Sequence, residues 1–414
     1  MTLSRIFVPF FTEMLLLNMM GTINTLMLSH YSDDAVAAVG SATQLLGMIL
    51  TFYTVIGTGA SIVINHNLGA ENTEKASDAA LTSIILCGSL SLVLGTCLSL
   101  AAKPLLGLMH LEGQVLDYAV TYFRIAVQFS FFQAVTSSIS GIFRSYGKPK
   151  ISVCVSLTMN GMNAALAYLV IFRPIELPVS GVTGIAAAYV CSQLFGLLLI
   201  LTFLRKIPLG LHFRQKTPAS LKIAVTMLKV GVPGGISSIS YNLSQVVSTS
   251  IIAILGVAAI STKIYVSNIV FYVYVFGMSL GLSTSLMIGW LAGAGKYEQA
   301  YRLNLQNLKL TITGSQVWML SFLIFLLAEP LLGCFTSDPQ IISMGRHLML
   351  IDILVEIGRG FNHVEENSLR GAGDVIYPMA VSMISCWTMS ILFSYILGIR
   401  MGLGLTGCWI AFAM

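Results

Sequence analysis

Twelve apolar stretches follow one another along this chain of 414 residues, separated by short polar or charged segments. All but the last exceed the ~20 residues that an α-helix needs to cross the hydrocarbon core of a bilayer. So many apolar segments could not all be buried inside one soluble domain. The stretches are 6–28, 36–65, 79–102, 117–143, 151–172, 182–204, 222–256, 259–291, 305–328, 343–368, 376–398 and 403–414.

Composition supports a membrane protein and leaves no room for a soluble catalytic domain. Hydrophobic residues make up 56% of the chain and charged residues only 9%, against roughly 25% charged residues in soluble domains. We therefore expect no enzyme activity. The net charge of +5 does not indicate nucleic acid as a partner, because lysines and arginines between spans set the orientation of membrane proteins.

The second half of the chain repeats the first. "LGAENTEKA" corresponds to "AGAGKYEQA", and "FRSYGK" corresponds to "LRGAGD". Such self-similarity is typical of transporters built from internal repeats. The five anchor pairs, at offsets of 223 to 226 residues, are Pro9 and Pro233, Gly69 and Gly293, Pro104 and Pro330, Arg144 and Arg370, and Gly181 and Gly404.

Each repeat holds six spans, so both halves enter the bilayer in the same direction. The predicted fold is an all-α polytopic membrane protein of twelve transmembrane helices in two six-helix bundles, related by a pseudo-twofold axis along the membrane normal. The predicted domains are an N-terminal bundle (1–206), a cytoplasmic linker (207–220) and a C-terminal bundle (221–414). Only seven residues follow Gly407, and we interpret the twelfth helix as truncated and the chain as a fragment.

Basic residues favour one orientation. With a cytoplasmic N-terminus, the outer loops hold few basic residues, such as Lys103, Arg173 and Arg400, as the positive-inside rule requires. We therefore predict a multi-pass protein of the cell membrane with both termini in the cytoplasm. The basic residues of the cytoplasmic segments are Arg5, Lys75, Arg144, Lys148, Lys150, Arg205, Lys206, Arg214, Lys216, Lys222, Lys229, Lys296, Arg302, Lys309 and Arg370.

The sequence contains no complete motif for nucleotide binding or metal binding. "GAGKY" at 293–297 lacks the first glycine of a nucleotide-binding loop and has Tyr297 in place of its Ser or Thr. "GLGLTG" at 402–407 lies in a membrane hairpin rather than after a strand, so we reject it as a dinucleotide site. The seven cysteines are scattered without ligand spacing, which predicts no metal site. Transport by such a chain would run on an ion gradient.

Ionisable residues inside the spans are functional candidates, because charge is costly at bilayer depth. Glu13 lies in the first span, where it is either a coupling carboxylate or a structural acid. Asp352, Glu356 and Arg359 in the tenth span share one helical face, as a cation, proton or cationic-substrate site or as a structural ion pair. Lys263, near the outer end of the eighth span, either reaches the interface or places a positive charge in the pathway.

Neutral polar residues complete the candidate list. Most could simply join helices by hydrogen bonds, and the alternative is that they line a substrate cavity. Tyr272 belongs to an aromatic run in the eighth span that could bind flat cations or contact lipid. The cavity and substrate candidates are Asn24, Gln133, Asn160, Asn163, Tyr241, Asn242, Gln245, Asn268 and Tyr272.

Taken in order, these motifs resemble the MATE (multidrug and toxic compound extrusion) family over essentially the whole chain. The marks are "AVAAVG", "LGAENTEKA", "AGAGKYEQA", "FRSYGKPK", "LRGAGD" and "GLGLTGCWIA". The resemblance implies two six-helix bundles and export of organic cations or other amphiphilic compounds in exchange for Na⁺ or H⁺, without a cofactor. It also implies a small-molecule substrate and a lipid bilayer as partners, and we expect a monomer.

Two positions depart from the pattern of this family. Many prokaryotic members have an aspartate in the first span where this chain has Asn24, and others have a glutamate in the seventh span where it has Tyr241. Neither residue can replace a carboxylate, so the coupling role would pass to Glu13, Asp352 and Glu356. The resemblance further implies a polar cluster of Asn24, Asn160 and Asn163, which could ligate Na⁺.

The leading hypothesis is a secondary active efflux antiporter working by alternating access. Two alternatives remain at this stage. A flippase for lipid-linked precursors would need a strongly cationic cavity, for which the spans offer Lys263 and Arg359. A non-transporting, degenerate relative would account for Asn24, Tyr241 and the short final span.

Overall fold

The structure is a computed structural model that describes residues 3–29, 31–107, 109, 111–172, 181–206, 219–312 and 315–414. Throughout these ranges the regular secondary structure is helical, with no strand, which confirms the all-α fold class. The chain forms two compact units, unit 1 (Met1–Val232) and unit 2 (Pro233–Met414). The predicted domain boundaries remain a prediction, and 207–218 lie outside the described residues.

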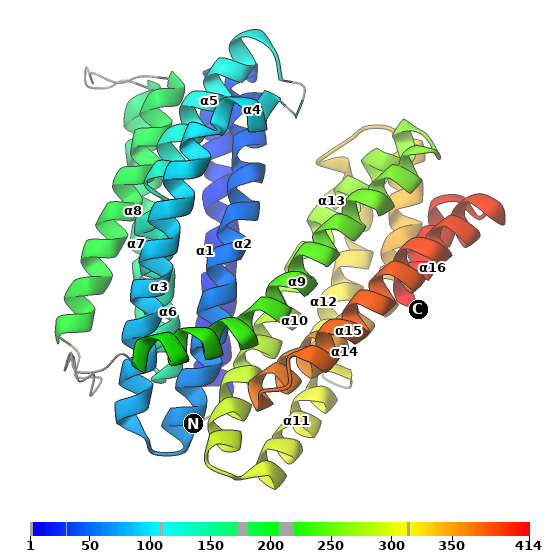
Figure 1. Cartoon of the computed structure of the whole chain (residues 1–414). Coiled ribbons are helices and arrows are strands. Elements are labelled where there is room, and N and C mark those ends of the chain that lie inside the picture. The colour runs from blue at the N-terminus through cyan, green and yellow to red at the C-terminus, as the bar shows by residue number, and fades with distance from the viewer. Residues whose placement is uncertain are drawn as a thin grey trace. The chain divides into compact units, whose positions relative to one another are not determined.

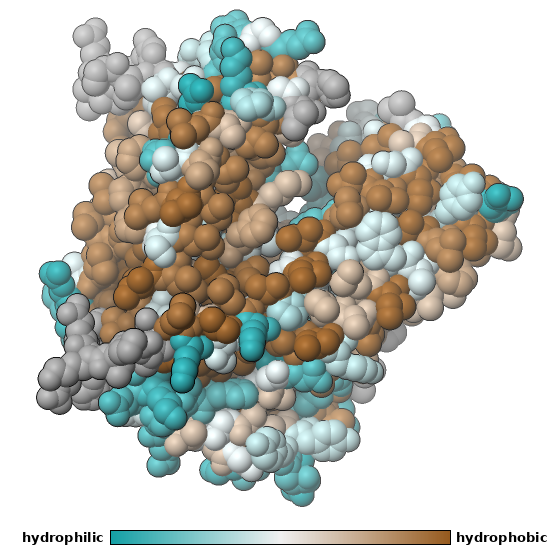
Figure 2. All heavy atoms as spheres, viewed as in Figure 1, coloured by the Kyte–Doolittle hydropathy of each residue, from teal (hydrophilic) through white to brown (hydrophobic). Residues whose placement is uncertain are grey.

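Unit 1 is a bundle of long helices that pack side by side (Figure 1). In Figure 2 its visible face is mostly apolar between hydrophilic ends, as expected for a bundle surrounded by lipid. Its helices are α1 (Leu3–Ser29), α2 (Asp33–Gly69), α3 (Thr73–Leu100), α4 (Ala102–Gly107), α5 (Gly113–Gln128), α6 (Ser130–Ser145), α7 (Pro149–Phe172) and α8 (Gly181–Lys206).

Unit 2 is also built of helices, but several of them are divided differently from those of unit 1. Helix α9 (Ala219–Ala253) begins in unit 1 and continues into unit 2 at Pro233. The remaining elements are α10 (Val257–Gly293), α11 (Tyr297–Ile312), α12 (Ser315–Leu326), α13 (Ala328–Gly333), α14 (Pro339–Ala372), α15 (Ile376–Ser385), the π-helix η1 (Cys386–Arg400) and α16 (Gly404–Ala413).

Seven of the described helices are long and apolar enough to cross a membrane, and an eighth span is formed if the bent pair α5–α6 counts as one. The stretch 117–143, expected as one span, is this pair, bent by 46°. The carbonyl oxygen of Val127 just before the bend lies 2.7 Å from where a Cβ on Gly95 of α3 would stand. Close contact with α3 therefore occurs where the helix breaks.

The internal repeat extends to details of the backbone. Helices α2 and α10 are both 37 residues long and end at Gly69 and Gly293. Two residues later, Glu71 and Gly295 both have positive φ, at 58° and 71°. This turn conformation is unfavourable for a residue with a Cβ, yet Glu71 adopts it. The two halves therefore share turn geometry as well as sequence motifs.

Small residues allow the helices to approach closely. A Cβ on Gly196 of α8 would lie 2.2 Å from the Met159 sulfur of α7, and a Cβ on Gly281 of α10 would lie 2.5 Å from the His363 carbonyl oxygen of α14. The pair α10 and α14 makes the most extensive helix contact in unit 2. This contact holds the charged residues of α14 inside the unit.

Candidate functional site

Charged and titratable side chains form one stripe along α14. Helical geometry places residues four, seven, eleven, fourteen and eighteen positions apart near one face. The stripe runs from the middle of α14 to its C-terminal end and combines three acids, two arginines and a histidine. Its members are Asp352, Glu356, Arg359, His363, Glu366 and Arg370.

The Glu356 carboxylate pairs with the Arg359 guanidinium one turn later on the same helix. Glu356 is 2% exposed, whereas the Arg359 side chain is 29% exposed. The Arg359 guanidinium also lies 5.7 Å from the ring centre of Tyr274 on α10. The pair predicted from the sequence therefore forms, and it places the buried acid behind a more accessible base.

Asp352 has a different partner from the one expected. Its Oδ1 accepts a hydrogen bond from the Trp409 indole N–H of α16 at 3.0 Å, and its side chain is 3% exposed. Among the described residues it makes no ion pair with Arg359. Asp352 is thus held by a neutral donor, which leaves its charge uncompensated by direct contact.

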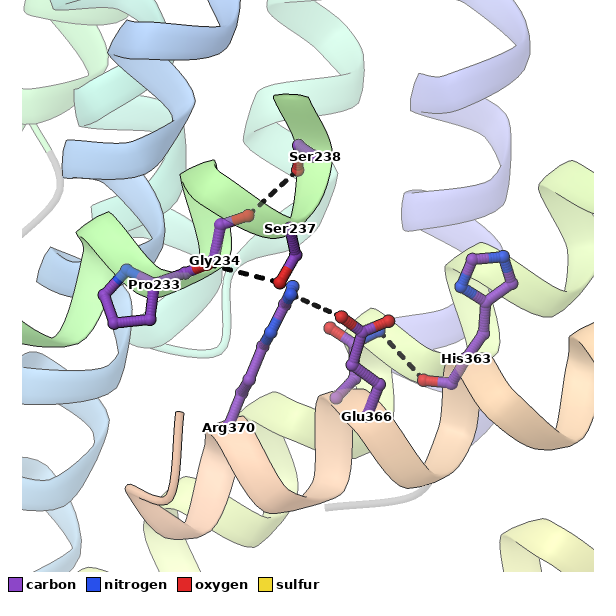
Figure 3. Close-up of polar contacts among 8 residues, drawn as sticks. Pro233, Gly234, Ser237, Ser238, His363, Glu366 and Arg370 are labelled. Carbon is purple, nitrogen blue, oxygen red and sulfur yellow. Dashed lines mark hydrogen bonds and ion pairs between the residues drawn. The ribbon is translucent and has the colours of Figure 1, made fainter. Parts of the chain in front are cut away.

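The C-terminal end of the stripe faces α9 (Figure 3). The Arg370 guanidinium pairs with Glu366 on its own helix and points towards the turn of α9 at Gly234. A Cβ on Gly234 would lie 3.6 Å from the Arg370 Cζ. The Ser237 hydroxyl of the same turn donates a hydrogen bond to the Pro233 carbonyl oxygen at 3.2 Å. This second ion pair was not anticipated from the sequence.

In unit 1 the arginine that corresponds to Arg370 pairs with Glu13 of a different helix. The Glu13 carboxylate lies 2.8 Å from Arg144 of α6, and the arginine also covers the ring of Phe10 at 5.4 Å. By the repeat offsets, Arg144 corresponds to Arg370, while Glu13 corresponds to Ser237. Glu13 therefore joins α1 to α6, which supports the structural alternative for this acid.

The other candidates of unit 1 are buried in a neutral polar interior. The Gln133 side-chain oxygen accepts a hydrogen bond from the Tyr189 hydroxyl, and the Asn160 amide donates to the Leu16 carbonyl oxygen at 3.1 Å. The Asn163 amide nitrogen is buried and has no hydrogen-bond partner within the described part of the chain. Asn24 lies in α1, where the side chain is outside the described part of the chain.

The candidates of unit 2 lie mostly on exposed helix faces. Tyr241 and Asn242 on α9, and Asn268 and Tyr272 on α10, are exposed, and Gln245 is half-buried. Of these five residues, Tyr241 is an electrostatic neighbour of Arg359 in the buried stripe of α14. Exposure fits contact with a substrate or with lipid equally well.

Lys263 is buried rather than directed to the interface. It is 8% exposed, and its ammonium donates to the Thr249 hydroxyl of α9 at 2.6 Å. The described residues give it no carboxylate partner. Lys263 therefore adds positive charge inside unit 2.

Sequence reasoning missed Trp409, His363 and the Arg144 and Arg370 pairs. Arg144 and Arg370 both follow apolar spans, so we interpreted them as basic residues that set the orientation of the chain in the membrane. The repeat alignment of Arg144 with Arg370 was the available signal, since an arginine kept in both halves has a place in the shared fold.

The comparisons with known proteins agree with this architecture. A profile of the MatE family matches residues 9–169 and 233–396, and the two segments start at the two prolines aligned by the repeat. The uncharacterized transporter YisQ of Bacillus subtilis is 34% identical, over 98% of this chain and 89% of that protein. The probable multidrug resistance protein NorM of Thermotoga maritima is 26% identical, over 99% of this chain and 88% of that protein.

Solved structures give the same result for the fold. A crystal structure of MATE in the bent conformation matches with a TM-score of 0.91 at 22% identity, over 99% of this chain and 90% of that one. At this identity the likeness concerns the fold alone.

Proposed function

This chain belongs to the MatE family, and we propose that it is a secondary active antiporter that works as a monomer by alternating access. As a member of the family it is a multi-pass membrane transporter of small molecules and not an enzyme. In our proposal it exports organic cations or other amphiphilic compounds, in exchange for Na⁺ or H⁺. No nucleotide-binding loop is found in the sequence, which favours an ion gradient as the energy source.

The charged stripe of α14 is the observation that carries the proposal. Burying carboxylates at membrane depth is costly, so such groups mark ion pathways by default. Asp352 and Glu356 are 3% and 2% exposed, and the repeat places Ala126 and Ser130 at the same positions of unit 1. We place ion coupling at Asp352 and Glu356 with Arg359 as their countercharge, and a structural role at Glu13.

Substrate contacts are proposed at neutral and aromatic groups. Gln133, Asn160 and Asn163 of unit 1 supply amides, with Asn24 of α1 beside them in our proposal. For coupling by Na⁺, we propose that Asn24, Asn160 and Asn163 bind the ion, because amide oxygens are suitable ligands for hard cations. In unit 2 the substrate would contact Tyr241, Asn242, Gln245, Asn268 and Tyr272.

We place the protein in the cell membrane with its N-terminus in the cytoplasm, by the positive-inside rule. The check uses two exposed lysines, Lys103 of α4 and Lys296 after α10, in a cysteine-free background. A membrane-impermeant maleimide added to intact cells should label Lys103→Cys and leave Lys296→Cys unlabelled until the cells are opened. The reverse labelling would invert the orientation.

Transport itself is tested with purified protein in liposomes containing ethidium, a fluorescent organic cation. We expect ethidium movement above that of protein-free liposomes when a Na⁺ gradient or a pH gradient is imposed, and none with ATP alone. Equal gradients across liposomes carrying a denatured sample are the control. A chain that moves neither ethidium nor a neutral amphiphilic dye under either gradient is not the proposed exporter.

A further inference from the structure

Tyr274 of α10 packs against the middle of the stripe. The Arg359 guanidinium lies over its ring at 5.7 Å from the ring centre, and the His363 ring meets it edge-on at 5.1 Å. Arg359 is the ion-pair partner of Glu356, and His363 precedes Glu366 by three residues on the same helix. Tyr274 therefore contacts neighbours of both ion pairs, whose acids are ten residues apart on α14.

His363 has a free nitrogen at the same place. Its Nε2 is buried and has no hydrogen-bond partner among the residues that the structure describes. A neutral imidazole can accept a proton at one nitrogen while releasing another, and histidine changes charge near neutral pH when unperturbed. A buried and unpartnered ring nitrogen is costly unless it has a function, and neither ion pair uses it.

The acids of the stripe are arranged for protons rather than for Na⁺. Glu356 is paired with a guanidinium, and Asp352 accepts an indole N–H. A Na⁺ ion would have to displace these donors and approach a fixed positive charge. A proton can add to the carboxylate itself and needs no cage of oxygen ligands.

The repeat restricts this arrangement to unit 2. By the offsets of 224 and 226 residues, the positions of Tyr274 and His363 hold Leu50 and Ser137 in unit 1. The positions of Glu356 and Glu366 hold serines, Ser130 and Ser140. The titratable side chains at these four positions are therefore present in unit 2 and are all replaced in unit 1, as expected if they act together.

We infer that Tyr274 and His363 form a proton path between Glu356 and Glu366, so that the coupling ion is H⁺. This inference rests on the proposed antiport and identifies its ion and route. Tyr274 takes the proton of the Glu356 carboxylic acid as it gives its own hydroxyl proton to Nε2 of His363. The resulting imidazolium releases one proton to the Glu366 carboxylate, which passes it on to solvent and is restored.

Water or side-chain rotation must complete each transfer, because no direct hydrogen bond joins these four groups among the described residues. In Figure 3 the His363 ring points away from the Glu366 carboxylate. The charged and titratable groups facing the path are Arg359 and Arg370 of α14, Tyr241 of α9 and the two glutamates. The two guanidiniums oppose a lasting positive charge on His363, so it passes the proton on rather than storing it.

The test compares two transport modes of the full chain in liposomes. One mode is ethidium movement driven by a pH gradient. The other is ethidium exchange at equal pH on both sides, which needs no net proton movement. The variants are His363→Gln and Tyr274→Phe, which keep side-chain size. The matched controls are His347→Gln, an exposed histidine of α14, and Tyr265→Phe, a tyrosine of α10 that stacks on Phe335.

Both path variants should lose at least about tenfold in the pH-driven rate, as is usual when a positioned proton-transfer group is removed. Exchange at equal pH should stay within about twofold, the melting temperature should be unchanged, and both controls should resemble the wild type. Path variants that keep the pH-driven rate overturn the route. A wild type driven by Na⁺ at equal pH, and not by a pH gradient, overturns H⁺ as the ion but leaves the antiport. A wild type with no transport in any mode overturns both.

Discussion

Glu356→Gln is expected to abolish gradient-driven ethidium transport, to the level of protein-free liposomes, without unfolding the protein. Glutamine keeps the shape and an acceptor for Arg359, but it cannot bind and release a proton. The buried Glu356 is the one acid of the stripe that is both paired to Arg359 and close to Tyr274, so no neighbouring carboxylate takes its place. The measurement is the initial rate under each ion gradient.

Glu13→Gln is the matched comparison, because it also removes one carboxylate from an arginine pair. We expect near-normal transport and a lower melting temperature, since the link between α1 and α6 is weakened. Breaking a buried ion pair lowers the free energy of unfolding by up to about 3 to 5 kcal/mol. Because the Arg144 side chain is 21% exposed, we expect the loss in Glu13→Gln to be about 3 kcal/mol or less. Normal transport by Glu356→Gln would remove Glu356 from the mechanism. Lost transport by a fully stable Glu13→Gln would move coupling to unit 1.

Gly281→Ala is expected to destabilise the protein markedly. The added methyl would lie 2.5 Å from the His363 carbonyl oxygen and 2.9 Å from the Asn367 amide nitrogen. The oxygen belongs to the backbone of α14, so α10 and α14 must move apart. Overpacking of this kind costs roughly 1 to 3 kcal/mol, and here it also disturbs the site of His363. Thermal unfolding in detergent measures the loss.

Gly57→Ala is the control that the repeat itself supplies. Gly57 of α2 is the counterpart of Gly281 at the offset of 224 residues, but a Cβ there meets nothing within 4 Å. Alanine should be neutral or should stabilise the helix by up to about 1 kcal/mol, because glycine is a poor helix former. Equal melting temperatures for the two variants would contradict the close packing of α10 on α14.

The repeat illustrates how far prediction from the sequence can go. Its offsets correctly align the ends of α2 and α10, and even the positive φ of Glu71 and Gly295. The same offsets do not predict that a Cβ on Gly281 would meet the backbone of α14, whereas a Cβ on Gly57 would meet nothing within 4 Å. Turn geometry depends on a few consecutive residues, whereas close packing depends on the neighbouring helix.

Partner choice at the candidate site shows the same limit. Glu356 and Arg359 lie three residues apart, so helical geometry alone predicts their pairing. For Asp352 the sequence left open an ion or substrate site and an ion pair with the same arginine, whereas its observed partner is Trp409, 57 residues away. The sequence left Glu13 open between a coupling role and a structural role, because its partner Arg144 lies 131 residues away. A contact between helices requires their relative rotation, which a single sequence does not contain.

By itself, the sequence determined the membrane environment, the all-α class, the two-fold repetition and the family, because apolar length, helical period and short motifs are local properties. The tertiary structure alone decided that Glu13 and Arg144 join two helices, that Trp409 holds Asp352, and that Tyr274 contacts both Arg359 and His363. These contacts depend on which faces of distant helices meet, and the close approach of small residues, rather than hydrophobic pattern, sets that choice.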